Sequence, residues 1–305
     1  MKENLKIEPF IATRHTKDEV SNGDKESGEY LGVTEDGVEL AREKAMEILE
    51  ILEKSQTGTV MFIGGASEAS RTKATARLIG DEIKRIVKEE SREDIEVLAA
   101  GEIVKIGMPI KKVIKEVEKM IQTNPQKKFL IDFPLFLKNF GARDLWKDMN
   151  GKGLPYREEL LAKVGDDHTA FVREWIANAG VFYDEKGNPV KDVNGRPIKG
   201  PNPTQIAKRH LEGIKRLTEF ARRFIGQQRP LIIGFVGHSW NLDALLVYLA
   251  NEGKVNLEGY EKLSQGRGII DFAELAQMEI KNNQAVLKYR DKEWLADLSK
   301  IPETV

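Results

Sequence analysis

The chain has 305 residues, of which 40% are hydrophobic and 32% charged, as expected for a soluble globular protein. Its 48 basic and 49 acidic residues give a formal net charge of −1, which argues against a nucleic-acid binder or a membrane-surface binder, because both need a basic excess. The lack of cysteine excludes disulfides, thiolate zinc sites and a cysteine nucleophile.

Strands and amphipathic helices alternate through the first half of the chain. We expect strands at residues 7–13, 59–63, 95–99 and 129–133, and helices at 35–54, 69–89 and 109–121. Thr34 is placed to cap the first of these helices, and Ser67 the second. No apolar run is long enough to span a bilayer, and the first residues lack a signal-peptide core, so we expect a cytoplasmic location.

The second half departs from this alternation before returning to it. Residues 158–177 have a helical pattern, and residues 181–198 are rich in turn residues, which predicts a β-hairpin excursion. Helices at 204–225 and 242–251 flank an apolar strand at 231–236. The last two strands are expected at 273–280 and 285–289, paired across Asn282-Asn283. The helical contexts of His168 and His210 are rich in charge, which favours surface positions for both.

Alternating strands and long helices predict an α/β fold, a three-layer α/β/α sandwich around a mainly parallel sheet. We expect a single domain over residues 1–305, with residues 134–204 inserted as an α+β cap. Functional groups in such sheets gather beyond the carboxyl ends of the strands. Arg14 and His15, then Ser67 and Arg71, and finally His238 each follow a predicted strand. If these strand ends meet, two arginines and two histidines surround one small anion.

These segments together resemble the histidine phosphatase superfamily, the phosphoglycerate-mutase-like group. The Arg-His-Gly of that family stands here as Arg14-His15-Thr16, with threonine in place of glycine. Its Leu-Thr-x-x-Gly-x-x-Gln-Ala signature is matched at threonine, glycine and alanine within residues 33–41, and its Ser-x-x-x-Arg-x-x-x-Thr-Ala throughout within residues 67–76. The last element, a histidine after an apolar strand, is matched by Gly237-His238. The resemblance implies phosphoryl transfer through a phosphohistidine, with neither metal nor cofactor and a small phosphorylated substrate.

Each of these residue types suits that chemistry. His15 is the expected nucleophile, since a neutral imidazole is nucleophilic near pH 7. Arg14 and Arg71 are expected to bind the equatorial phosphate oxygens, and His238 to add a further donor. In one branch of the family a glutamate after the third strand protonates the leaving group, which points to Glu102, with Glu96 and Glu158 as alternatives.

Other residues are candidates for contacting the substrate, namely Lys17, Ser21, Asn22 and Ser239. The aspartate that follows the second histidine in the other branch of the family is Ser239 here. No His-x-x-x-His or Asp-x-Asp cluster points to a metal site.

Three other functions are consistent with parts of the sequence. A phosphoglycerate-mutase-like phosphotransferase uses the same groups, and a non-catalytic phosphate-ester-binding pseudoenzyme keeps the pocket without turnover. Gly237-His-Ser239-Trp-Asn241 is similar to the nucleophile elbow of a serine α/β-hydrolase, but no histidine follows His238 to complete a triad. Substrate identity and oligomeric state stay open.

Overall fold

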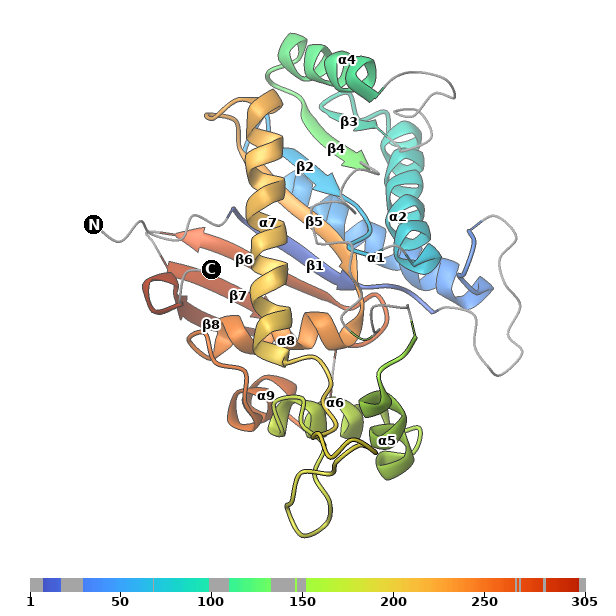
Figure 1. Cartoon of the computed structure of the whole chain (residues 1–305). Coiled ribbons are helices and arrows are strands. Elements are labelled where there is room, and N and C mark those ends of the chain that lie inside the picture. Colours follow the sequence, from blue (N-terminus) through green and yellow to red (C-terminus); the bar gives the residue numbers. More distant parts are fainter. Residues whose placement is uncertain are drawn as a thin grey trace.

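The computed structural model describes residues 8–17, 30–67, 69–98, 110–132, 146, 152–266, 268, 270–281 and 284–301. Its centre is an eight-stranded sheet in the order β3-β4-β2-β5-β1-β6-β7-β8 (Figure 1). The strands are β1 (Phe10–Arg14), β2 (Val60–Ile63), β3 (Ile95–Leu98), β4 (Lys128–Asp132), β5 (Leu231–Gly237), β6 (Leu275–Lys281), β7 (Gln284–Tyr289) and β8 (Lys292–Asp297). The helices are α1 (Glu35–Lys54), α2 (Ser70–Glu89), α4 (Ile110–Thr123), α5 (Pro155–Val164), α6 (His168–Ala177), α7 (Pro203–Ile225), α8 (Ser239–Ala250) and α9 (Leu257–Ser264), with a 3-10 turn at Leu298–Lys300.

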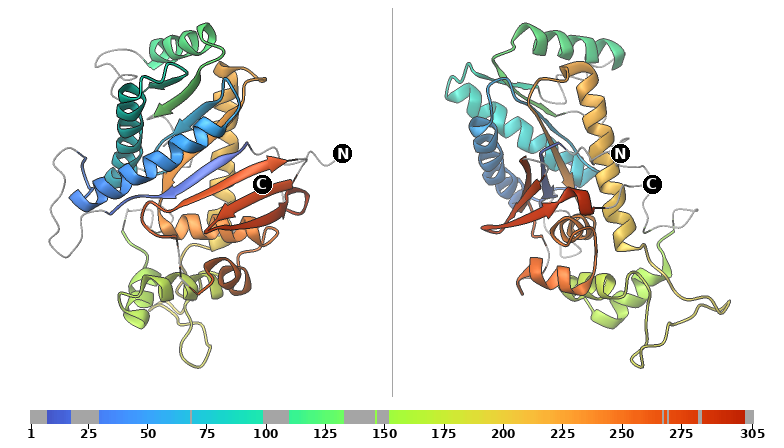
Figure 2. Two further views of the ribbon diagram at one scale, coloured as in Figure 1. Left: turned by 180° about the vertical axis from the view of Figure 1, so that it is seen from behind. Right: turned by 90° about the vertical axis from the view of Figure 1, so that its left-hand side faces the viewer.

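The sheet is parallel from β3 to β1 and antiparallel from β1 to β8. Helices α1 and α2 cover one face, and α7 and α8 pack on the other, as the edge-on view of Figure 2 shows. Alternate strand residues point to the two faces, so Ile11 and Met61 join the core under α1 and α2, whereas Phe10 and Phe62 join the core under α7 and α8. The predicted α/β fold with a mainly parallel sheet and three layers is confirmed.

Several predicted elements have different bounds in the structure. The predicted helix at 158–177 is two helices, because Gly165 ends α5 with a φ of +66° and Asp167 caps α6 by accepting a hydrogen bond from the Ala170 amide at 2.9 Å. Helix α8 begins at Ser239, three residues earlier than expected. Helix α9 and strand β8 were not predicted.

The predicted excursion at 181–198 is present as bridged turns rather than as two regular strands. Isolated antiparallel bridges join Val181 to Lys199, Tyr183 to Pro189 and Lys191 to Pro197. Together with α5 and α6 it lies at one end of the molecule, beyond α8 (Figure 1). Of the predicted insertion at 134–204, the structure describes Trp146 and residues 152–204. The other residues of the insertion lie outside the described residues, as does the predicted turn at Asn282-Asn283.

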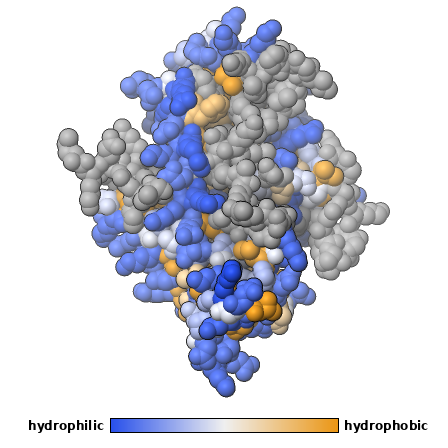
Figure 3. Space-filling view, viewed as in Figure 1, coloured by the Kyte–Doolittle hydropathy of each residue, from blue (hydrophilic) through white to orange (hydrophobic). Residues whose placement is uncertain are grey.

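Where Figure 3 colours the surface, it is largely hydrophilic, and hydrophobic side chains show in small groups. Five large apolar side chains of the described residues are exposed, namely Leu31, Met46, Met120, Val193 and Leu295. They come from separate elements, and scattered exposed side chains of this kind are ordinary. Among the described helices, none combines the length and the apolarity needed to cross a membrane.

The prediction that His210 lies on the surface is wrong. Its side chain is buried on α7, where Nδ1 donates to the Ile206 carbonyl at 3.2 Å. Ile206, His210 and Ile214 follow one another at a spacing of four residues, so His210 belongs to the apolar stripe of the helix. The charged neighbours of His210 in the sequence lie on other sides of α7.

Burial makes His210 a source of acid sensitivity. It lowers the pKa of His210 from 6.5 to about 4, against the opposing hydrogen bond to Ile206. Between these two pH values the unfolded chain binds a proton that the folded protein does not, so stability is lost as the pH falls from 6.5 towards 4. We expect His210 to account for about 2 kcal/mol of the stability lost between pH 7 and pH 5.

Urea unfolding of the wild type and of His210→Leu at both pH values measures this loss. The variant lacks the titrating ring, so its stability is expected to fall less between pH 7 and pH 5. Equal falls in the two proteins would mean that His210 is charged in the folded state, contrary to its burial.

Candidate active site

The carboxyl ends of β1 and β5 place the first and last motifs side by side. The strands pair in parallel with Arg14 opposite Gly237, and the His15 amide donates to the Gly237 carbonyl at 2.9 Å. His238 follows directly, so the ring centroids of His15 and His238 lie 5.2 Å apart, edge to face. Parallel pairing therefore joins residues separated by more than 220 positions in the sequence.

The chain after β2 brings in the second arginine. Gly65 bridges to Val236 of β5, and the Ala66 amide donates to the Val236 carbonyl at 2.7 Å. A β-carbon on Gly65 would lie 3.0 Å from the backbone of Thr72, so glycine allows this segment to run close against α2. Arg71, in the first turn of α2, thereby comes close enough for its charge to lower the pKa of His15.

Ser67 has a different role from the predicted helix cap. Its Oγ lies 2.9 Å from Nε2 of His238 and accepts a hydrogen bond from the Ala69 amide at 3.2 Å. The N-cap position of α2 is Ala69, which makes no side-chain capping bond. The serine of the third motif thus contacts the histidine of the fourth.

The His15 ring is buried and held in one tautomer. Only 5% of His15 is exposed, and its Nδ1 lies 2.8 Å from the Thr16 carbonyl oxygen. Because a carbonyl oxygen only accepts, Nδ1 carries the proton and Nε2 has the lone pair. Burial lowers the pKa of His15 to about 2, with the nearby His238, Arg71 and Arg14 adding to the effect and the Thr16 carbonyl opposing it. His15 is therefore neutral near pH 7.

Threonine in place of the family's glycine has a structural explanation. The Thr16 side chain is fully buried, its Oγ1 donates to the Gly37 carbonyl at 2.6 Å, and its amide donates to Thr75 Oγ1 at 3.2 Å. Thr34 caps α1 by accepting from the Gly37 amide at 3.1 Å. A β-carbon on Gly37 would lie 2.4 Å from the Lys17 carbonyl oxygen. The matched residues of the second motif thus hold the segment after His15 against α1.

Arg14 is oriented by residues that precede β6. Its Nη1 donates to the Ile270 carbonyl at 3.1 Å, and its guanidinium lies 3.9 Å from the ring centroid of Phe272. The Phe272 ring also lies 5.7 Å from that of His15. The structure thus brings Arg14, His15, Arg71 and His238 together, as the sequence predicted.

Neither a protein-family model nor a curated protein matches the sequence, but solved structures do. A mycobacterial glucosyl-3-phosphoglycerate phosphatase in complex with VO3 is 14% identical, with a TM-score of 0.40 over 89% of this chain and 91% of its own. The product of an open reading frame of Mycobacterium tuberculosis is 12% identical, with a TM-score of 0.42 over 94% and 98%. A phosphoglycerate mutase from Plasmodium falciparum is 10% identical, with a TM-score of 0.32 over 95% and 97%.

The sequence motifs described above, and not these neighbours, carry the resemblance to the histidine phosphatase superfamily. The four motifs that carry the resemblance meet at one place in the fold, beyond the carboxyl ends of β1 and β5. That edge of a parallel sheet is where such folds bind their ligands.

The other predicted site residues lie in different settings. Lys17 is exposed and pairs with Asp36 at 3.3 Å, and Ser239 is buried at the first position of α8. Glu96 pairs with Lys127 at 3.3 Å on β3, and Glu158 is exposed on α5. The expected acid Glu102 and the candidates Ser21 and Asn22 lie outside the described residues.

Sequence reasoning missed an aromatic contact beside His238. The indole Nε1 of Trp240 donates to His168 Nε2 at 2.5 Å, and the two rings stack with centroids 5.5 Å apart. His168 is therefore half-buried in an aromatic cluster, not on the surface as predicted. Burial lowers its pKa to about 4, and the charge of Arg14 adds to this. The pattern gave no sign of the contact, because His168 lies 70 residues before His238 on a separate helix.

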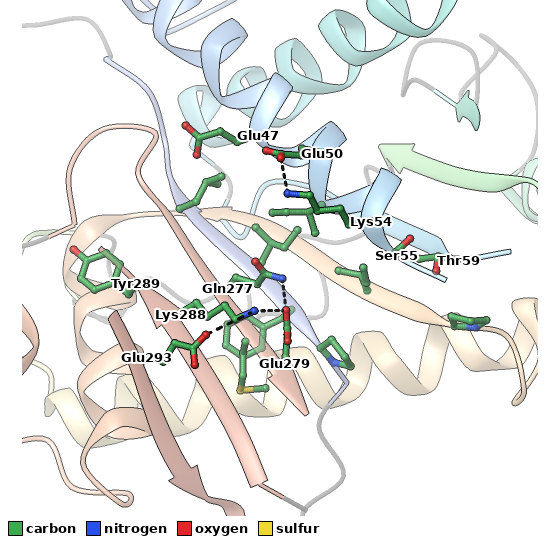
Figure 4. A pocket seen from close by; sticks show the side chains of 18 of the residues that line it. Glu47, Glu50, Lys54, Ser55, Thr59, Gln277, Glu279, Lys288, Tyr289 and Glu293 are labelled. Carbon is green, nitrogen blue, oxygen red and sulfur yellow. Dashed lines mark hydrogen bonds and ion pairs between the residues drawn. The ribbon is translucent and has the colours of Figure 1, made fainter. Parts of the chain in front are cut away.

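A groove of about 910 Å³ lies elsewhere on the molecule (Figure 4). It runs between α1 and the strands β1, β6 and β7, and it includes the start of β1 at Phe10 and that of β5 at Leu231. Arg14, His15, Arg71 and His238 do not line it, and it adjoins the amino ends of the parallel strands. Within the part of the chain that the structure describes, no three His, Asp or Glu side chains are grouped so that they could hold a metal ion.

Proposed function

We propose that the chain is a phosphomonoester hydrolase that needs no metal and acts through a phosphohistidine on His15. The observation that carries the proposal is the His15 ring. It is neutral and fixed by the Thr16 carbonyl, and it lies beside the cationic Arg14 and Arg71 and the imidazole of His238. A nucleophile surrounded by groups that bind a phosphoryl dianion is what in-line phosphoryl transfer requires.

The reaction has two steps in this proposal. The lone pair of His15 Nε2 attacks phosphorus, the N–P bond forms, and the P–O bond to the leaving group breaks. Arg14 and Arg71 bind the equatorial oxygens through charge-assisted hydrogen bonds, while Ser67 orients His238 towards the same oxygens. Water then attacks phosphorus and gives a proton to the carboxylate that protonated the leaving group in the first step. The N–P bond breaks, and orthophosphate leaves with the ring and the acid restored.

The leaving oxygen takes a proton from an acid in the first step. We retain Glu102 in that role, on the resemblance described above. Glu96 is disfavoured because it pairs with Lys127 along β3, and Glu158 because it is exposed on α5.

We also propose that residues 134–204 act as a cap that selects the leaving group. The support is the contact between its α6 and the start of α8, where His168 accepts from Trp240, two residues after His238. Arg157 of α5 adds a second contact, with its guanidinium 5.9 Å from the Trp240 ring centroid. A substrate at His15 would therefore lie close to residues of this segment.

The test is hydrolysis of para-nitrophenyl phosphate with and without a chelator, followed by an alkaline quench. Alkali is used because phosphohistidine decomposes in acid. We expect turnover that the chelator leaves unchanged, and a phosphoryl group on His15 by mass spectrometry. Loss of turnover with the chelator would overturn the metal-free reaction. Transfer of the phosphoryl group from His15 to an added acceptor alcohol would indicate a mutase. Binding of phosphate without turnover would indicate a pseudoenzyme.

A further inference from the structure

Arg14 is held from behind by the residues that lead into β6. Beyond the Ile270 carbonyl and the Phe272 ring, the Ala273 amide donates to the Arg14 carbonyl at 3.2 Å. Both the backbone and the side chain of Arg14 thus depend on the segment of residues 270–274. A shift of this segment would move the guanidinium away from its position near His15.

Two contacts fix the flanks of this segment. Glu274 forms a two-pronged ion pair with Arg290, whose Nε lies 2.7 Å from Oε1 and whose Nη2 lies 3.0 Å from Oε2. The Arg290 side chain is 8% exposed, and its Nη1 also donates to the carbonyls of Ser264 at 3.2 Å and Gly268 at 3.3 Å. These bonds anchor the chain before and after Ile270 but do not reach Ile270 itself.

Ile270 is held by a buried carboxyl from α8. Asp243 Oδ1 accepts a hydrogen bond from the Ile270 amide at 3.1 Å, and the residue is only 3% exposed. The contacts Asp243–Ile270 and Ile270–Arg14 therefore form a continuous chain from the interior to the site. Asp243 lies five residues after His238, so α8 both begins directly after His238 and, through Asp243, holds the residue that contacts Arg14.

We propose that Asp243 is a positioning residue for Arg14, acting through the amide and the carbonyl of Ile270. The inference rests on the proposed function, because its consequence is the orientation of a phosphate-binding guanidinium. One donor of Arg14 is committed to the Ile270 carbonyl, and Phe272 fixes the plane of the guanidinium. The other donors then have a fixed direction, which an arginine needs in order to bind phosphate through two parallel bonds.

The charge state of Asp243 gives the inference a second consequence. Burial raises the pKa of Asp243 to about 8, while the Ile270 amide bond and the charges of Arg14 and Arg290 oppose the rise and Glu274 adds to it. Tyr260 of α9 also faces this carboxyl. Asp243 is thus mostly uncharged near pH 7, and above pH 8 its negative charge offsets part of the positive charge of Arg14 and is expected to weaken phosphate binding.

Inorganic phosphate binding, measured by titration calorimetry, tests this without requiring turnover. Asp243→Asn keeps the acceptor in uncharged form and is expected to bind within about twofold of the wild type at pH 7. Asp243→Leu removes the acceptor and is expected to bind about tenfold more weakly. Leu245→Ala is the control for a general loss of α8 stability. Residue 245 lies about 200° around the helix from Asp243, so this variant weakens the packing of α8 but keeps the contact between Asp243 and Ile270.

The outcomes separate the two proposals. A wild type that does not bind phosphate contradicts the proposed function and, with it, this inference. A wild type that binds, with a folded Asp243→Leu that binds equally well, contradicts the role of Asp243 alone. If Asp243→Leu does not fold, the phosphate affinities of the wild type and of Asp243→Asn are measured from pH 7 to pH 9.5 and their ratio is taken. The protonation of phosphate affects both affinities equally, so it cancels in the ratio. A fall in that ratio supports the inference, and a constant ratio overturns it.

Discussion

Alanine in place of His15 is expected to lower kcat/KM for para-nitrophenyl phosphate by about 10⁴-fold or more, because the attacking lone pair is removed. Phosphate binding is expected to persist, since Arg14, Arg71 and His238 contribute most of its hydrogen-bond donors. Steady-state kinetics and calorimetric phosphate binding on the same preparations measure the two effects separately.

His210→Leu is the matched control for the His15 variant. It also removes a buried, neutral imidazole that is hydrogen-bonded to a backbone carbonyl, but on α7. It should be less stable and fully active. Substantial turnover in His15→Ala would show that the phosphoryl group never passes through His15.

Lysine in place of Arg14 is expected to lower kcat/KM by about 100-fold even though the positive charge is kept. The guanidinium bonds the Ile270 carbonyl and stacks on Phe272 while it presents further donors to phosphate. An ammonium group has no planar fork with which to do all three. We expect KM to rise and kcat to fall together, because these donors bind the phosphate in the ground state and bind the phosphoryl group more strongly in the transition state.

Arg229→Lys provides a close structural control for this change. Arg229 also lies over a ring, that of Phe129 at 5.3 Å, and also donates to carbonyls, those of Gly58 at 2.6 Å and Ile121 at 2.7 Å. It lies just before β5, at the end of the sheet away from His15. Comparable activity in Arg14→Lys and Arg229→Lys would mean that Arg14 makes no special contact with the substrate.

Much of the site could be predicted because its residues follow directly from the strand ends. In a parallel sheet the register fixes which ends are neighbours, so Arg14 had to lie beside Gly237 and His238 once β1 and β5 were adjacent. The capping role of Thr34 also follows from local rules that a sequence makes visible. Periodicity alone predicted most of the helices, including the full extent of α1.

The residues that orient the site could not be predicted in the same way. Phe272 and Ile270 precede an antiparallel strand, and nothing in their local pattern indicates that they lie behind Arg14. In the sequence, Asp243 is only a polar residue within an apolar helix. The tertiary structure alone shows that it accepts a hydrogen bond from the Ile270 amide. His210 was mispredicted because charge near it in the sequence was given more weight than its spacing from Ile206.

The position of β1 has a consequence for how the polypeptide acquires its shape. This strand is flanked by β5 and β6, which begin 221 and 265 residues after its own first residue, Phe10. Contacts between residues so distant along the chain form slowly, because closing the long intervening loop costs conformational entropy. During synthesis, the segment bearing Arg14 therefore leaves the ribosome long before either neighbour exists. The position of Arg14 and His15 between their neighbours can therefore be fixed only after β6 has been made.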